Sequence, residues 1–179
     1  MNITDRPTAP HPDEALPGVP TFTVTSSTAA HLDRMPHHVT AAGGSTSPHL
    51  AWSGFPAETQ SFMVTCFDPD APVPSGYWHW CIVDIPEQVT ELHEGAGTSD
   101  LELDGPAFHL RGDHGEPSFF GAAPPAGDRP HRYVFTVYAL DVDTLGVDDD
   151  TTIATASFMA IPHVIARASL TWEYSHPTR

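Results

Sequence analysis

Two segments of the sequence hold acidic or imidazole side chains beside several prolines, and these are the residues that could do chemistry. The first segment is Asp68-Pro69-Asp70-Ala71-Pro72, with His79 shortly after it. Because proline fixes φ and keeps the preceding residue extended, this loop presents two carboxylates on a stiff backbone. Stiff loops that carry polar groups are common binding sites. The alternative is an ordinary solvated turn, since Asp and Pro are frequent turn residues.

The second segment is the proline-rich stretch 121–130, which is followed by His131. Tyr133 lies two residues beyond His131, so both side chains are expected on one face of a strand. Imidazole and phenol groups both form hydrogen bonds, which makes this strand end a second candidate for a polar site. A histidine at the end of a strand can also do no more than satisfy a structural hydrogen bond.

Strands are the elements expected to position these residues. Apolar residues alternate with polar ones in some runs, and two runs are bulky on both faces, as in the interior of a sandwich. Alternation places Trp78 and Trp80 on one face of their strand and His79 on the other. The pattern predicts strands at about 21–24, 50–52, 61–67, 77–85 and 132–140.

Helical periodicity occurs only late in the chain, at Phe158, Ile161, Ile165 and Ala168. Pro162 lies inside this run, where it would remove a hydrogen bond from a continuous helix. We therefore expect a short helix that ends near Ala160 and a second one that begins at Pro162. The predicted fold is mainly β, a β-sandwich of mostly antiparallel strands with one or two short peripheral helices near the C-terminus.

Length and composition narrow the function. A chain of 179 residues predicts one domain, which we assign to 21–179, because 1–20 carries five prolines and is interpreted as a flexible arm outside the fold. Seven basic against 23 acidic residues argue against nucleic-acid binding and stable membrane association. No leader-like or spanning segment is recognised, so a cytoplasmic location is expected. Cys66 and Cys81 lie in apolar runs and are expected to be buried, although a bridge between them stays open.

The two candidate segments resemble a known family when they are taken together. Asp68–Pro72 followed by Trp78-His79-Trp80 resembles the first signature block of the phosphatidylethanolamine-binding protein family. Gly121–Pro125 followed by Pro130-His131-Arg132-Tyr133 is similar to its second block. The similarity extends from about residue 22 to about residue 174.

Two further segments resemble the bacterial branch of that family, often labelled Raf-kinase-inhibitor-like. Ser47–Trp52 is similar to the segment upstream of the first block. His163–Ala166 resembles the start of the last helix of that branch.

The resemblance implies that both blocks meet at the end of a β-sandwich and line a small anion-binding cavity. The implied ligand is phosphate, acetate or a phosphorylated headgroup, held by imidazole and phenol donors, and the carboxylates are expected to fix the tautomers of the imidazoles. The resemblance implies no cofactor, metal or catalytic residue. It does imply a homodimer and a role as regulator or inhibitor of an unidentified partner protein. The implied ligand-binding residues are Asp68, Asp70, Pro72, His79, Gly121, Pro124, His131 and Tyr133.

An enzyme is the alternative to a binding module. Asp70, His79 and His131 could form a metal site of two histidines and one carboxylate. A serine hydrolase has less support, because the sequence has no Gly-x-Ser-x-Gly motif around a nucleophile. A module that only forms dimers is a third alternative.

Overall fold

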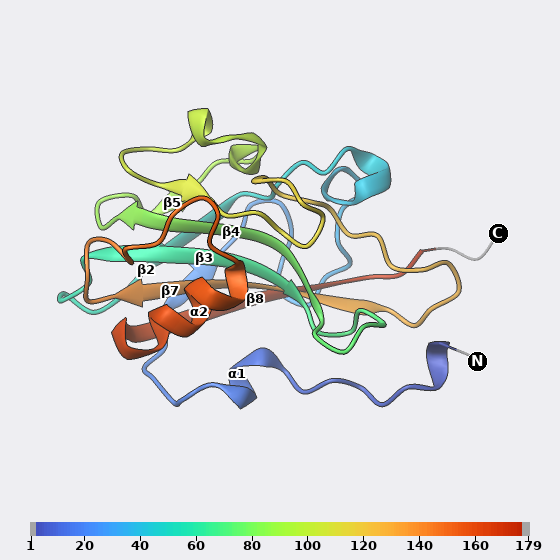
Figure 1. Ribbon diagram of the computed structural model, residues 1–179. Helices are drawn as coiled ribbons and strands as arrows, with labels where there is room; N and C mark the ends of the chain where they lie inside the picture. The colour runs from blue at the N-terminus through green and yellow to red at the C-terminus, as the bar shows by residue number, and fades with distance from the viewer. Residues whose placement is uncertain (1–2, 177–179) are drawn as a thin grey trace.

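Five antiparallel strands form the larger of two β-sheets in the computed structural model, which describes residues 3–176 (Figure 1). Their order across the sheet is β6-β4-β3-β7-β8. The bounds are β3 Ser61–Asp68, β4 Tyr77–Pro86, β6 Phe108–His109, β7 His131–Leu140 and β8 Val164–Tyr174. The smaller sheet, β1-β2-β5, consists of β1 Thr23–Thr25, β2 Leu50–Ser53 and β5 Glu91–Leu92. This architecture confirms the predicted fold class.

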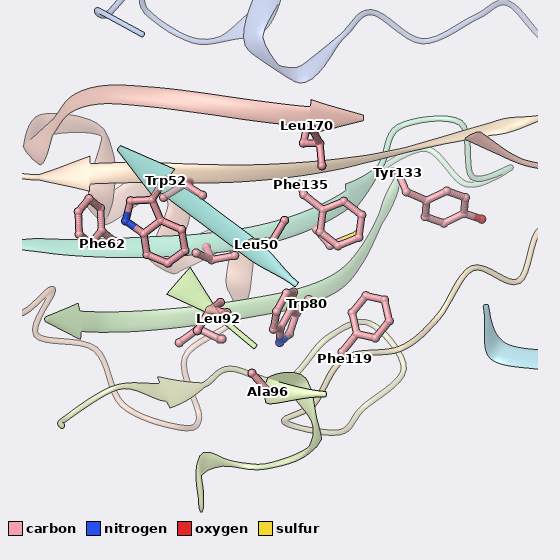
Figure 2. Packing of buried hydrophobic residues seen from close by; sticks show 14 of the residues in the cluster. Leu50, Trp52, Phe62, Trp80, Leu92, Ala96, Phe119, Tyr133, Phe135 and Leu170 are labelled. Carbon is pink, nitrogen blue, oxygen red and sulfur yellow. The ribbon is translucent and has the colours of Figure 1, made fainter. Parts of the chain in front are cut away.

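The main hydrophobic core lies between the two sheets (Figure 2). Leu50 and Trp52 of the smaller sheet point toward Phe62, Trp80 and other large side chains of the larger sheet. The Trp52 and Phe62 rings meet edge to face, with centroids 5.3 Å apart. Such a pair adds about 1 kcal/mol to the free energy gained from burying the rings.

A second cluster covers the opposite face of the larger sheet, beneath helix α2, Ile153–Ala160. The Thr152 side chain caps this helix by accepting a hydrogen bond of 3.2 Å from the amide of Thr155. The predicted helix that ends near Ala160 is confirmed. The other described helices are α1, Pro12–Ala15, and 3-10 turns at Ile3–Asp5, His37–Val39, Ala41–Gly43, Ala96–Thr98, Asp100–Glu102 and Ile161–His163.

The predicted second helix from Pro162 is wrong, and so is the interpretation of His163–Ala166 as the start of a last helix. A single 3-10 turn ends at His163, and the chain then enters β8. The apolar residues of this run also alternate, so that Ala166, Ala168, Leu170 and Trp172 are all buried. Pairing with β7 over nearly the whole of β8 satisfies the backbone groups and selects the strand.

Residues 3–20 lie along the larger sheet on the side of α2 (Figure 1). Arg167 of β8 donates a hydrogen bond of 2.9 Å to the Asp13 carboxylate and one of 2.8 Å to the carbonyl of Pro17. The interpretation of the arm as a segment outside the fold is therefore corrected for its described residues. The domain boundary at residue 20 stays a prediction.

Cys66 and Cys81 are free thiols and both are buried, so they form no bridge with each other. Within residues 3–176, no helix is long and apolar enough to cross a membrane.

Candidate functional site

A β-bulge in β4 turns His79 toward the interior of the sandwich. Cys66 pairs with Trp80 and Phe67 pairs with Trp78, so one step along β3 spans two residues of β4. His79 is the additional residue, and bulges of this kind redirect a side chain. Its ring contacts Tyr133 edge to face, with centroids 5.1 Å apart.

The bulge overturns the predicted faces of this strand. Trp80 belongs to the core between the sheets, whereas Trp78 packs with the cluster on the opposite side and contacts the Phe67 ring at a tilt, with centroids 4.4 Å apart. Strict alternation would have put both tryptophans on one face. His79 contacts Tyr133, which is part of the same core as Trp80.

A pocket of about 220 Å³ opens where the two sequence segments meet. The loop after β3 forms one wall and the loop before β7 the other, with Tyr77 and Phe120 between them. Five of the eight predicted residues line it: Asp68, Pro72, His79, Pro124 and His131.

His79 presents a neutral imidazole to this pocket. Its Nδ1 donates a hydrogen bond of 2.7 Å to the carbonyl of Phe120, so the lone pair lies on Nε2. Burial lowers the pKa of His79 to about 4. At neutral pH its Nε2, which has no partner among the described residues, can therefore accept a hydrogen bond but cannot donate one.

His131, the first residue of β7, is held between two carboxylates. Its Nδ1 lies 2.7 Å from Oδ2 of Asp68, and its Nε2 lies 3.0 Å from Oδ2 of Asp128. Burial alone would favour the neutral form, but the hydrogen bonds and charges of Asp68 and Asp128 raise the pKa of His131. Both ring nitrogens are engaged, so an anion would have to break one of these bonds to bind His131 directly.

Asp70 faces away from the histidines. Its carboxylate accepts hydrogen bonds of 2.7 and 2.9 Å from the Arg132 guanidinium and lies 3.7 Å from Arg129. Burial opposes the charged form, but the hydrogen bonds and charge of Arg132 lower the pKa of Asp70. The carboxylate that orients His131 is thus Asp68, and Asp70 orients an arginine instead. Since Asp70 points elsewhere, it does not complete the metal site considered with His79 and His131.

Tyr133 and Gly121 support the pocket from behind. The Tyr133 hydroxyl is buried and has no hydrogen-bond partner within 3.5 Å among the described residues, although the amide of Ala123 lies close to it. Burial raises the pKa of this phenol, so it remains protonated and can donate. Gly121 donates its amide to the Ser45 hydroxyl at 3.0 Å, and a Cβ there would lie 2.4 Å from the backbone of Thr40.

Asp128, Arg132 and His114 are among the residues that sequence reasoning did not assign to this site. Asp128 and Arg132 flank His131 in the sequence, and their charge beside a candidate histidine was the available signal. His114 stacks on the Phe120 ring with centroids 5.1 Å apart, and both its ring nitrogens are buried without a partner among the described residues. No local sequence pattern marked His114. Among residues 3–176 there is no group of three His, Cys, Asp or Glu side chains arranged to hold a metal ion.

Comparison with known proteins identifies the family. The model of the family described as "Phosphatidylethanolamine-binding protein" matches residues 25–175. The chain belongs to the phosphatidylethanolamine-binding protein family. YbhB of Escherichia coli K12 is 43% identical over 148 residues, which cover 80% of this chain and 93% of YbhB. YbcL of the same organism is 47% identical over 133 residues, or 74% of this chain and 73% of YbcL.

A solved member of the phosphatidylethanolamine-binding protein family has the same fold. The crystal structure of Escherichia coli YbcL superposes with a TM-score of 0.84 and 41% sequence identity, and it covers 87% of this chain and 98% of that one. The family match begins at residue 25, so the arm lies outside it. The two signature blocks lie inside it, and their loops form the walls of the pocket.

Proposed function

We propose that this protein binds a small oxyanion in the pocket without transforming it, with phosphate, acetate or a phosphorylated headgroup as the ligand class. The observation that carries the proposal is a free acceptor in the lining of the pocket together with a free donor directly behind it. The acceptor is Nε2 of His79 and the donor is the hydroxyl of Tyr133. A buried donor without a partner costs about 1–3 kcal/mol, which a ligand oxygen would recover.

The charges around the pocket support an anion despite the net charge of −16 for the whole chain. Three carboxylates beside the pocket are each paired with at least one cation, so this group of ion pairs carries no net negative charge. The carboxylates are Asp68, Asp70 and Asp128, and the cations are Arg6, Arg129, Arg132 and protonated His131.

The neutral state of His79 favours an oxyanion that still carries a proton. Such a ligand donates its O–H to Nε2 of His79 and accepts from the Tyr133 hydroxyl. A phosphate monoester loses its second proton near pH ~6, so binding weakens as the pH rises above that value.

A module that binds a ligand without transforming it acts through the partner proteins that it contacts in the ligand-bound state. We extend the proposal to a regulatory or inhibitory role toward a partner protein, and to a homodimer in the cytoplasm. Support for the regulatory role and for the homodimer comes from the resemblance alone. Sedimentation equilibrium of the purified chain, with and without phosphate, tests the dimer.

Calorimetric titration with inorganic phosphate at pH 5.5, 7 and 8.5 tests the proposed ligand. Tyr133→Phe removes one donor and is expected to weaken binding about tenfold. Tyr138→Phe is the matched control, because Tyr138 lies on the same strand but in the cluster beneath α2. Absence of heat with both phosphate and acetate at every pH would contradict the proposal. Turnover of a phosphate monoester that disappears in His79→Asn would favour the enzyme instead.

A further inference from the structure

The arm is bound to the sheet by arginines that donate to its backbone carbonyls. Arg129 donates hydrogen bonds of 2.9 Å to the carbonyls of Arg6 and Pro7, and Arg132 donates one of 2.6 Å to that of Ala9. Prolines lack an amide hydrogen, so a proline-rich segment is held through its carbonyls, and the arginine fork suits that task. These contacts bring the N-terminal end of the arm beside the loops of the pocket (Figure 1).

Arg6 joins an ion-pair cluster behind the pocket, which is formed by Asp68, Asp128 and His131. Its Nη1 lies 3.0 Å from Oδ1 of Asp128 and its Nη2 lies 2.8 Å from Oδ2, a two-pronged contact with a carboxylate whose side chain is 0% exposed. Nη2 also lies 3.2 Å from Nε2 of His131 and donates to the carbonyl of Asp70. Arg6 thus contacts both a pocket-lining histidine and the carboxylate that pairs with it.

We propose that Arg6 is a positioning residue of the pocket, which anchors Asp128 and through it sets the orientation and charge of His131. The inference rests on the proposed function in so far as the pocket binds an anion. The charged groups that face His131 are Asp68 from the end of β3, Asp128 from the preceding loop and Arg6 from the arm. Arg6 is the one among these three that lies outside the region matched to the family.

Removal of Arg6 should change the charge of His131, because both residues compete for Oδ2 of Asp128. Both Nη2 of Arg6 and Nε2 of His131 approach that oxygen, and the guanidinium disfavours a second positive charge on the imidazole. Without Arg6, His131 alone would neutralise Asp128 and would hold its proton to higher pH. The pocket would also lose a nearby cation, which weakens the attraction for an anion.

Arg6→Gln tests this inference with two readouts. NMR titration of the assigned His131 ring is expected to show a higher midpoint than in the wild type, and calorimetry is expected to show phosphate binding about fivefold weaker. Arg6→Lys keeps the charge but lacks the two-pronged geometry, so intermediate values are expected. Arg34→Gln is the charge-matched control, because Arg34 packs over the Tyr174 ring. It is expected to leave both readouts unchanged.

An Arg6→Gln protein with the wild-type titration midpoint and the wild-type phosphate affinity would overturn the inference. If only the midpoint moves while phosphate binds as tightly as in the wild type, Arg6 does not serve the pocket and the inference also fails. If the wild type itself does not bind phosphate, the proposed function fails. The link from Arg6 to His131 is then judged by the midpoint alone, and a shift supports it while no shift refutes it.

Discussion

Acid should destabilise this protein largely through His79. Burial lowers the pKa of this imidazole to about 4 in the folded chain, whereas an unfolded histidine titrates near pH ~6.5. At pH values between these two pKa values, the His79 imidazole is protonated in the unfolded chain and neutral in the folded chain. The free energy of unfolding therefore falls as the pH falls. A shift of that size corresponds to about 3 kcal/mol lost on going from pH 7 to pH 4.

Other buried histidines also make stability depend on pH and must be separated from His79. Burial also lowers the pKa of His109 and His114, so these residues add to the loss at acid pH. His131 has the opposite sign, because Asp68 raises its pKa. Its contribution to stability is fully present below the unfolded pKa and disappears as the pH rises through the raised value.

His79→Asn isolates the effect, because asparagine can still donate an N–H to the carbonyl of Phe120 but cannot be protonated. Urea unfolding followed by tryptophan fluorescence at pH 7, 5.5 and 4 measures the free energy of unfolding. The variant is expected to lose about 3 kcal/mol less than the wild type over this range. His93→Asn, whose side chain is 58% exposed, is the control and should behave as the wild type does. Equal losses in His79→Asn and the wild type would refute the reasoning.

Two further substitutions test the parts that support the pocket. His131→Ala leaves the buried carboxylates of Asp68 and Asp128 without their shared partner, so urea unfolding at pH 7 should show a loss of about 3–5 kcal/mol. Unchanged stability would mean that His131 is not the centre of this ion-pair cluster. Gly121→Ala places a methyl group against the backbone of Thr40 and should cost about 1–3 kcal/mol in thermal unfolding. Gly18→Ala meets open space and should cost far less, and equal effects would contradict the packing argument.

The long central strands were predictable because their side chains carry the signal locally. The runs 61–67, 77–85 and 132–140 are rich in apolar residues, and the strands begin and end within one residue of those limits. The segment around Ile165 and Ala168 was not predictable in this way, since its apolar residues satisfy both a helical and an alternating pattern. Pairing with β7, which is distant in sequence, selected the strand.

The sequence by itself placed the two proline-stiffened loops and the two candidate histidines at the ends of strands whose apolar patterns are local. Only the tertiary structure decided what each residue does there. The bulge in β4 turns the His79 side chain inward. The pairing of β3 with β7 puts Asp68, and not Asp70, within hydrogen-bond distance of His131. The packed arm places Arg6 beside His131. Hydrogen-bond partners depend on separations of a few tenths of an ångström between strands and loops far apart in the chain. Residue spacing along a sequence does not encode such distances.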